Sequence, residues 1–200
     1  MSKTAFLFSG QGSQYPGMGR ELLNANPEFS YIYETGSDIL GFDLAKLTFE
    51  GSEGELAQTC NSQPAIMAMS LLCFKTAEKN GFSFDAAAGH SLGEYAAMTA
   101  AEMISLEDAF RIIKARAAAM DKAGNETDGA MYAIMKMSPE EIEKICADTE
   151  GYVVPVNYNS PAQTVIAGEK AAAEKAAAAF AEAGARAVQL MSLIHISEPT

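Results

Sequence analysis

Residues 89–93, which read Gly-His-Ser-Leu-Gly, constrain the fold more than any other part of the sequence. They fit the pattern Gly-x-Ser-x-Gly, in which a serine sits on a sharp turn between a strand and a helix. Glycines two residues before and after the serine relieve the steric crowding of that turn. Alanines at 86–88 would by composition favour a helix, but the motif requires a strand there. We therefore predict an α/β fold that exposes the hydroxyl group of Ser91.

A serine nucleophile needs a base, most often a histidine, and the chain contains two histidines. His90 is adjacent to Ser91, and neighbouring residues of an extended chain point to opposite sides. It can line the site but is poorly placed as the base. His195 follows later in the chain, as a base would, yet its apolar flanks equally suit a disordered or mispaired tail. Backbone N–H groups at the start of the helix after Ser91 can hold a developing oxyanion.

Arg116 is the second candidate site residue. Ser105 is a suitable N-cap for a helix that runs to about Lys122, and Arg116 falls inside the apolar stripe of that helix. The stripe consists of Leu106, Ala109, Phe110, Ile113, Ala117 and Met120. A buried guanidinium group without a partner is costly, so it should meet a carboxylate of the protein or of a substrate. The alternative is that its side chain reaches the surface.

The composition excludes several classes of function. The formal net charge of −12 over 200 residues opposes binding to nucleic acid or to an anionic membrane surface. No apolar run approaches the roughly 20 residues that cross a bilayer, and the N-terminus does not resemble a signal peptide. The three cysteines, at 60, 73 and 146, have no metal-binding or redox spacing. We expect a cytoplasmic protein without a metal, with its cysteines packed as small buried side chains.

The pattern of hydrophobic and turn residues changes at a polar hinge, residues 124–129. Before the hinge we predict a buried strand at 4–8 that leads into a glycine-rich loop, a strand before Ser91, and a long buried helix over 64–79. After the hinge the predicted order is strand, helix, two strands, helix and strand, as in a ferredoxin-like unit. These elements are expected at 130–136, from Ser138, at 152–159, 163–167, 169–183 and 185–190.

Four segments together resemble one family, the malonyl-CoA:acyl carrier protein transacylases and the related acyltransferase domains of polyketide synthases. Residues 8–14 are similar to its opening motif, with Ser9 in place of the usual proline. Residues 89–94 match the nucleophile motif, and Arg116 with its neighbours matches the arginine-bearing helix. Residues 156–168 are similar to a segment of the small subdomain. The resemblance covers about residues 3–190.

The resemblance implies an α/β-hydrolase-like large subdomain, residues 1–125 and incomplete, with a ferredoxin-like small subdomain at 126–190. It implies that Ser91 takes malonyl from coenzyme A and passes it to the phosphopantetheine thiol of acyl carrier protein. Backbone N–H groups of Gln11 and Leu92 would form the oxyanion hole, and Arg116 would pair with the malonyl carboxylate. Malonyl-CoA and acyl carrier protein would be the partners. The coenzyme A thioester would be a substrate, with no cofactor bound permanently.

The same resemblance places Gln63 near the site, with His90 lining it, and expects a Ser–His dyad. Residues 191–200 depart from the family's phrase around its histidine, so His195 is a doubtful base. We expect this segment to be an aberrant tail that replaces the rest of the large subdomain, and the truncated chain to be weak or inactive. Two alternatives stay open: a non-catalytic fragment that binds acyl groups or carrier protein, and a serine esterase.

Overall fold

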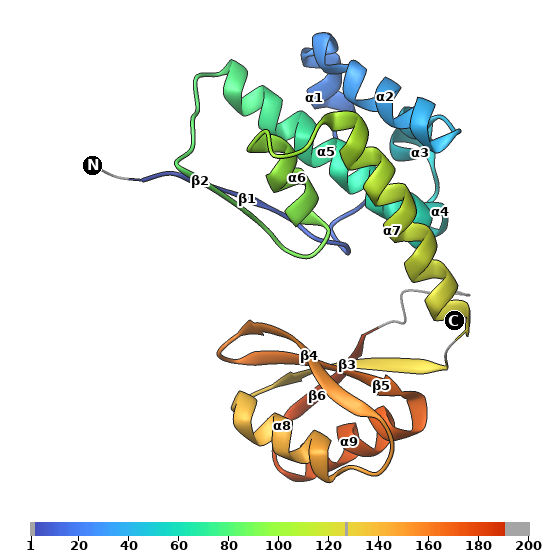
Figure 1. The fold of residues 1–200 in the computed structure, drawn as a ribbon, viewed down its shortest axis with the longest axis vertical. Coiled ribbons are helices and arrows are strands. Elements are labelled where there is room, and N and C mark those ends of the chain that lie inside the picture. The colour runs from blue at the N-terminus through green and yellow to red at the C-terminus, as the bar shows by residue number, and fades with distance from the viewer. Residues whose placement is uncertain (1–2, 127, 191–200) are drawn as a thin grey trace. The chain divides into compact units, whose positions relative to one another are not determined.

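The computed structural model describes residues 3–126 and 128–190, and its fold is mixed α/β. The chain forms two compact units, Met1–Asp121 and Lys122–Thr200, and the division falls within helix α7 (Leu106–Glu126). Figure 1 shows both units, which are treated separately below. Within the described ranges, no helix is long and apolar enough to cross a membrane.

The first unit is built on two parallel strands, β1 (Ala5–Phe8) and β2 (Ala86–Gly89), paired from Ala5–Ala86 to Phe8–Gly89. Parallel strands need a long crossover, and here it is helical throughout. The crossover contains α1 (Arg20–Ala25), the 3-10 helix η1 (Pro27–Phe29), α2 (Tyr31–Leu40), α3 (Leu44–Glu50), α4 (Glu53–Ala57) and α5 (Thr59–Lys79). After β2 come α6 (Gly93–Ala100), which packs on both strands and on α5, and then α7.

Helix α5 forms the centre of this unit, as its apolar sequence predicts. Its side chains Ile66, Met67 and Leu72 are buried in one cluster with residues of α2, α6 and α7. The helix begins at Thr59, five residues before the predicted start at Pro64. Proline removes its own N–H donor and crowds the carbonyl group four residues before it, but the Gln58 carbonyl group accepts from the N–H groups of Asn61 and Ser62, so the first turn forms upstream of Pro64.

Two expectations about burial were wrong. Strand β1 was expected to be buried, but among its residues only Phe8 is buried, and Leu7 is 80% exposed. In the part of the chain that the structure describes, β1 pairs with β2 alone, so its other edge and one face lie open. The cysteines were expected to be buried, but only Cys146 is; Cys60 and Cys73 are exposed.

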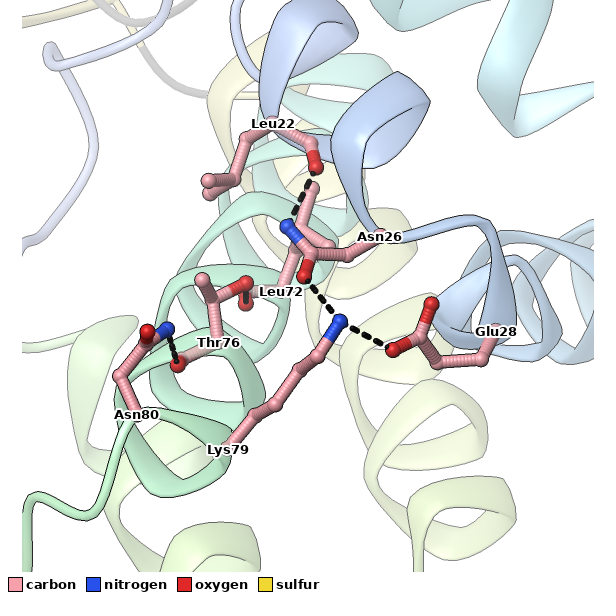
Figure 2. A network of polar contacts seen from close by, with 7 residues as sticks. All are labelled: Leu22, Asn26, Glu28, Leu72, Thr76, Lys79 and Asn80. Atoms are coloured by element: carbon pink, nitrogen blue, oxygen red, sulfur yellow. Dashed lines mark hydrogen bonds and ion pairs between the residues drawn. The ribbon is translucent and has the colours of Figure 1, made fainter.

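A polar network joins the C-terminal end of α5 to the segment between α1 and η1 (Figure 2). Asn26 is 7% exposed; its side-chain amide donates to Leu22 O at 2.9 Å and accepts from Lys79 Nζ at 2.8 Å. Lys79 also pairs with Glu28 at 2.5 Å, and this hydrogen bond lowers the pKa of that carboxyl group. Asn26 therefore satisfies a helix-end carbonyl group while it fixes the lysine.

We expect Asn26→Ala to destabilise the first unit by about 1–3 kcal/mol, because a buried acceptor and the lysine both lose a partner. Chemical denaturation followed by circular dichroism measures this change. Asn80→Ala is the matched control, since exposed Asn80 also donates to a helix carbonyl, Thr76 O at 2.7 Å, without tying two segments together. Equal losses in the two variants would contradict a special role for Asn26.

The second unit is a four-stranded antiparallel sheet with the order β4-β5-β3-β6. Its elements are β3 (Gly129–Met135), α8 (Pro139–Asp148), β4 (Val153–Ser160), β5 (Gln163–Glu169), α9 (Lys170–Glu182) and β6 (Arg186–Leu190). Both helices cover one face of the sheet (Figure 1), where Ile134, Ile166 and Phe180 are buried. Ser138 caps α8 through a capping box with Glu141, as its position predicts.

Candidate active site

Ser91 occupies a strained turn between strand β2 and helix α6. Its φ angle is 54°, in the left-handed region that residues other than glycine seldom adopt. The turn is closed by hydrogen bonds from Gly93 N–H to His90 O at 3.0 Å and from Glu94 N–H to Ser91 O at 3.1 Å. Leu92 is buried while Ser91 is exposed. The strand predicted at this point is confirmed, and the turn displays the hydroxyl group of Ser91 to solvent.

The two glycines of the motif are required by close packing of the backbone. A Cβ atom on Gly93 would lie 2.2 Å from Phe8 O, and one on Gly89 would lie 2.0 Å from Gly93 C. The end of β1 thus packs directly against the start of α6. Gly10, in the loop after β1, approaches His90 in the same way: a Cβ atom there would lie 2.7 Å from His90 O. Backbone contact, rather than side-chain packing, fixes the turn at Ser91.

We expect Gly93→Ala to destabilise the first unit by about 3 kcal/mol or more, because the added methyl group overlaps backbone atoms that cannot move independently. Thermal unfolding of the variant measures the loss. Gly54→Ala in α4 is the control: a Cβ atom there meets nothing within 4 Å, so this variant should keep or slightly raise stability. A Gly93→Ala variant as stable as the starting chain would show that the turn accommodates a methyl group for which the structure leaves no room.

Arg116 on α7 reaches Ser91. Its NH2 group donates to Ser91 Oγ at 2.9 Å, and its NH1 group donates to Gln63 Oε1 at 2.6 Å. Gln63 on α5 is fully buried, and its amide also donates to Met120 Sδ at 3.3 Å. The Arg116 guanidinium carbon lies 5.7 Å from the centre of the Tyr95 ring on α6. Three helices therefore contribute to one cationic site beside the serine.

The sequence left two carboxylate partners open for Arg116, one from the protein and one from a substrate. No Asp or Glu among residues 3–126 and 128–190 pairs with Arg116, and its hydrogen-bond acceptors are the neutral Gln63 and Ser91. The side chain is half-buried, so the charge is partly removed from water. A half-buried cation with only neutral acceptors attracts an anion. The site is suited to a ligand that brings its own carboxylate.

The glycine-rich loop after β1 is tied to α5 beside this site. Gln11 Nε2 donates to Ser62 Oγ at 3.1 Å, and Ser62 is fully buried next to Gln63. The side chain of Gln11 thus anchors the loop that carries its backbone N–H group. Ser13 Oγ further donates to Gly10 O at 3.0 Å, which closes the loop on itself.

The thiols of the three cysteines are less readily ionised than a free thiol. Burial, followed by the nearby Asp121 charge, raises the pKa of the Cys60 thiol. Burial also raises the pKa of Cys73, and it raises the pKa of Cys146 to about 11. Thiolate is the reactive form of cysteine, so all three side chains remain protonated near neutral pH.

The structure brings together Ser91, Arg116 and Gln63 by direct hydrogen bonds, and the Gln11 loop is attached to α5 next to Gln63. His90 lies against Gly10 of this loop. The backbone N–H group of His90 donates to Phe8 O at 3.0 Å. His195 lies outside the described residues, as do the other residues of 191–200. Sequence reasoning missed Tyr95; the available signal was its position one helical turn after Ser91.

The fold and this geometry define a class: mixed α/β proteins in which a strand–serine–helix turn stands beside a cationic anchor. The comparisons with known proteins narrow the class. The chain matches the acyl transferase domain family over residues 5–193, and it belongs to that family. It is 42% identical over 189 residues to the malonyl CoA-acyl carrier protein transacylase of Escherichia coli strain K12, and 39% identical to that of Bacillus subtilis strain 168.

Solved structures agree with this assignment. A malonyl-transacylase in complex with a type II PKS acyl-carrier protein is 41% identical, with a TM-score of 0.90 over 96% of this chain and 64% of its own. The malonyl CoA-acyl carrier protein transacylase of Clostridium perfringens also gives a TM-score of 0.90, at 38% identity, over 95% of this chain and 61% of its own. Each of the two sequence matches covers 93% of this chain. The chain spans 61% of the length of the Escherichia coli relative and 60% of the length of the Bacillus subtilis relative.

Proposed function

We propose that this protein transfers a malonyl group from coenzyme A to acyl carrier protein through an ester on Ser91. The observation that carries the proposal is the 2.9 Å hydrogen bond between Arg116 NH2 and Ser91 Oγ. It places a cation that has no carboxylate partner among residues 3–126 and 128–190 next to an exposed hydroxyl group on a strained turn. A malonyl thioester has a carbonyl group for the serine and a free carboxylate for the arginine. The names of the relatives agree with this substrate.

The transfer has two halves. Ser91 Oγ attacks the thioester carbonyl carbon, the carbon–sulfur bond breaks, and coenzyme A leaves as a thiol with the proton that the serine gives up. The phosphopantetheine thiol of the carrier protein then attacks the ester, and its proton returns to Ser91 Oγ. Backbone N–H groups of Gln11 and Leu92 stabilise the oxyanion in both halves. The thioester is the substrate, and the chemistry needs no bound cofactor.

The proposal also includes the two histidines of the chain, of which the structure describes His90 but not His195. His90 would line the site. The base would be a histidine, and the candidate in this sequence is His195. The residues around His195 depart from the family's phrase, so we expect this 200-residue chain to load malonyl slowly. Water must be excluded until the second thiol arrives, since the ester would otherwise be hydrolysed.

We also propose the division into subdomains that the resemblance implies. Residues 1–125 would be the α/β-hydrolase-like large subdomain, which the parallel pair β1–β2 and the turn at Ser91 support. Residues 126–190 would be the ferredoxin-like small subdomain, which the β-α-β-β-α-β order and the antiparallel sheet support. Limited proteolysis followed by mass spectrometry tests the boundary, with cleavage expected near residue 126.

The test of the function is malonyl loading. The purified chain is incubated with malonyl-CoA, and intact-mass and peptide analysis then locate the acyl group; carrier protein is added in a second step. Acylation of Ser91, followed by its transfer to the carrier thiol, supports the proposal. Binding of malonyl-CoA without acylation would favour a non-catalytic acyl-binding protein. Release of free malonate that outruns transfer would favour an esterase.

A further inference from the structure

Tyr95 contacts the cationic anchor with its aromatic ring. The guanidinium carbon of Arg116 lies over its ring, 5.7 Å from the ring centre, within the roughly 6 Å range of a cation–π contact. Gln63 and Ser91 accept from N–H groups of the same guanidinium, and such groups donate in the guanidinium plane. The ring therefore contacts the cation in addition to the two hydrogen-bond acceptors.

Tyr95 is held by packing of its side chain and by hydrogen bonds of its backbone. Tyr95 lies one turn after Ser91 on α6, half-buried, and packs against the hydrophobic cluster of the first unit. The backbone carbonyl group of Tyr95 accepts from Thr99 Oγ1 at 2.7 Å, and its backbone N–H group donates to Leu92 O at 3.2 Å, so the helix holds the main chain at this residue. In Figure 1, α5, α6 and α7 lie together in the first unit, so the ring bridges the nucleophile helix and the arginine helix.

We propose that Tyr95 is a specificity-determining positioning residue, which keeps the Arg116 guanidinium aimed at the carboxylate of the acyl donor; this rests on the proposed function. An incoming carboxylate takes N–H groups in the guanidinium plane, and so competes with Ser91 and Gln63 for them. The ring attracts the cation through its π face rather than by accepting one of these hydrogen bonds. Tyr95 is therefore the support that persists when the substrate binds, and it favours donors that carry a carboxylate.

The experiment is a competition for loading. The 200-residue chain is given equal concentrations of malonyl-CoA and acetyl-CoA, and mass spectrometry measures the ratio of malonyl to acetyl on Ser91. This ratio depends on relative rates, so it is insensitive to the fraction of folded protein. Tyr95→Met removes the ring and fills its space, and the ratio is expected to fall about two- to fivefold. Tyr95→Phe keeps the ring and should keep the ratio.

A second background separates positioning from packing. In Arg116→Ala protein the ring has no cation to hold, so adding Tyr95→Met should leave the ratio unchanged; Tyr95→Leu replaces Tyr95→Met if the latter does not fold. An unchanged ratio in Tyr95→Met, or a lowered ratio in Tyr95→Phe, would overturn the role of Tyr95 while the transacylase function stood. Absence of any malonyl preference in the starting chain would overturn the proposed function, and this inference with it.

Discussion

Replacing Ser91 by alanine is expected to abolish acylation of the protein by malonyl-CoA. The variant loses only the hydroxyl group at the turn, and burial raises the pKa of all three cysteine thiols, which lowers the fraction of reactive thiolate. Loss of a serine nucleophile lowers rates by a factor of at least about 1,000. Radiolabelled or mass-tagged malonyl-CoA, followed over time on the intact chain, measures the change.

The control for this experiment is Ser83→Ala. Ser83 is an exposed serine in the loop between α5 and β2 of the same unit, so it reports any non-specific acylation of surface serines. We expect Ser83→Ala to load as the starting chain does. Malonyl bound covalently to the Ser91→Ala protein at the rate of the starting chain would exclude Ser91 as the nucleophile. Circular dichroism spectra of both variants should match that of the starting chain.

Replacing Arg116 by alanine should change the choice of acyl group rather than abolish the chemistry. A hydrogen bond to a charged group contributes about 1.5–3 kcal/mol, so the preference for malonyl over acetyl should fall about 10- to 150-fold. Competition between the two coenzyme A thioesters measures it directly. Arg116→Lys should recover only part of the preference, because lysine keeps the charge but cannot offer a carboxylate two N–H groups in one plane.

Arg111→Ala is the matched control for the arginine. Arg111 lies on the same helix but is exposed, and it pairs with Asp108 at 2.8 Å. Its removal takes away one positive charge without touching the site, so the malonyl preference should not change. A fall in preference as large as that of Arg116→Ala would mean that the overall field of the protein, and not a local anchor, selects the substrate.

Local sequence signals predicted the elements that position the site. Glycine spacing around Ser91 predicted the strand–turn–helix despite alanines that favour a helix, and the structure shows why: each glycine meets backbone at a distance that no side chain allows. Ser105 and Ser138 predicted helix starts, and both accept from the N–H group three residues on. The helix caps depend on a few neighbouring residues, while the glycines of the motif also indicate a close backbone contact with β1, as between Gly93 and Phe8.

Features that depend on distant neighbours were harder to predict. The exposure of Leu7 depends on which elements lie beside β1, and the hydrophobic pattern of the strand itself does not contain that information. The position of Arg116 in an apolar stripe predicted a special environment, but not that its acceptors would be an amide and a hydroxyl group. Tyr95 reads as an ordinary core residue of a helix. Only the packing of α6 against α7 turns its ring into a support for a cation.

The hydrogen bond from Arg116 to Ser91 also fixes the direction in which the serine proton can leave. A guanidinium group has donors and no acceptor, so Ser91 Oγ accepts from Arg116 and must turn its own hydrogen elsewhere. The surroundings of the hydroxyl group thus have a donor side, occupied by Arg116, and an acceptor side, toward which the hydroxyl hydrogen points. Any histidine that acts as the base for Ser91 has to lie on the acceptor side, whatever part of the polypeptide carries it.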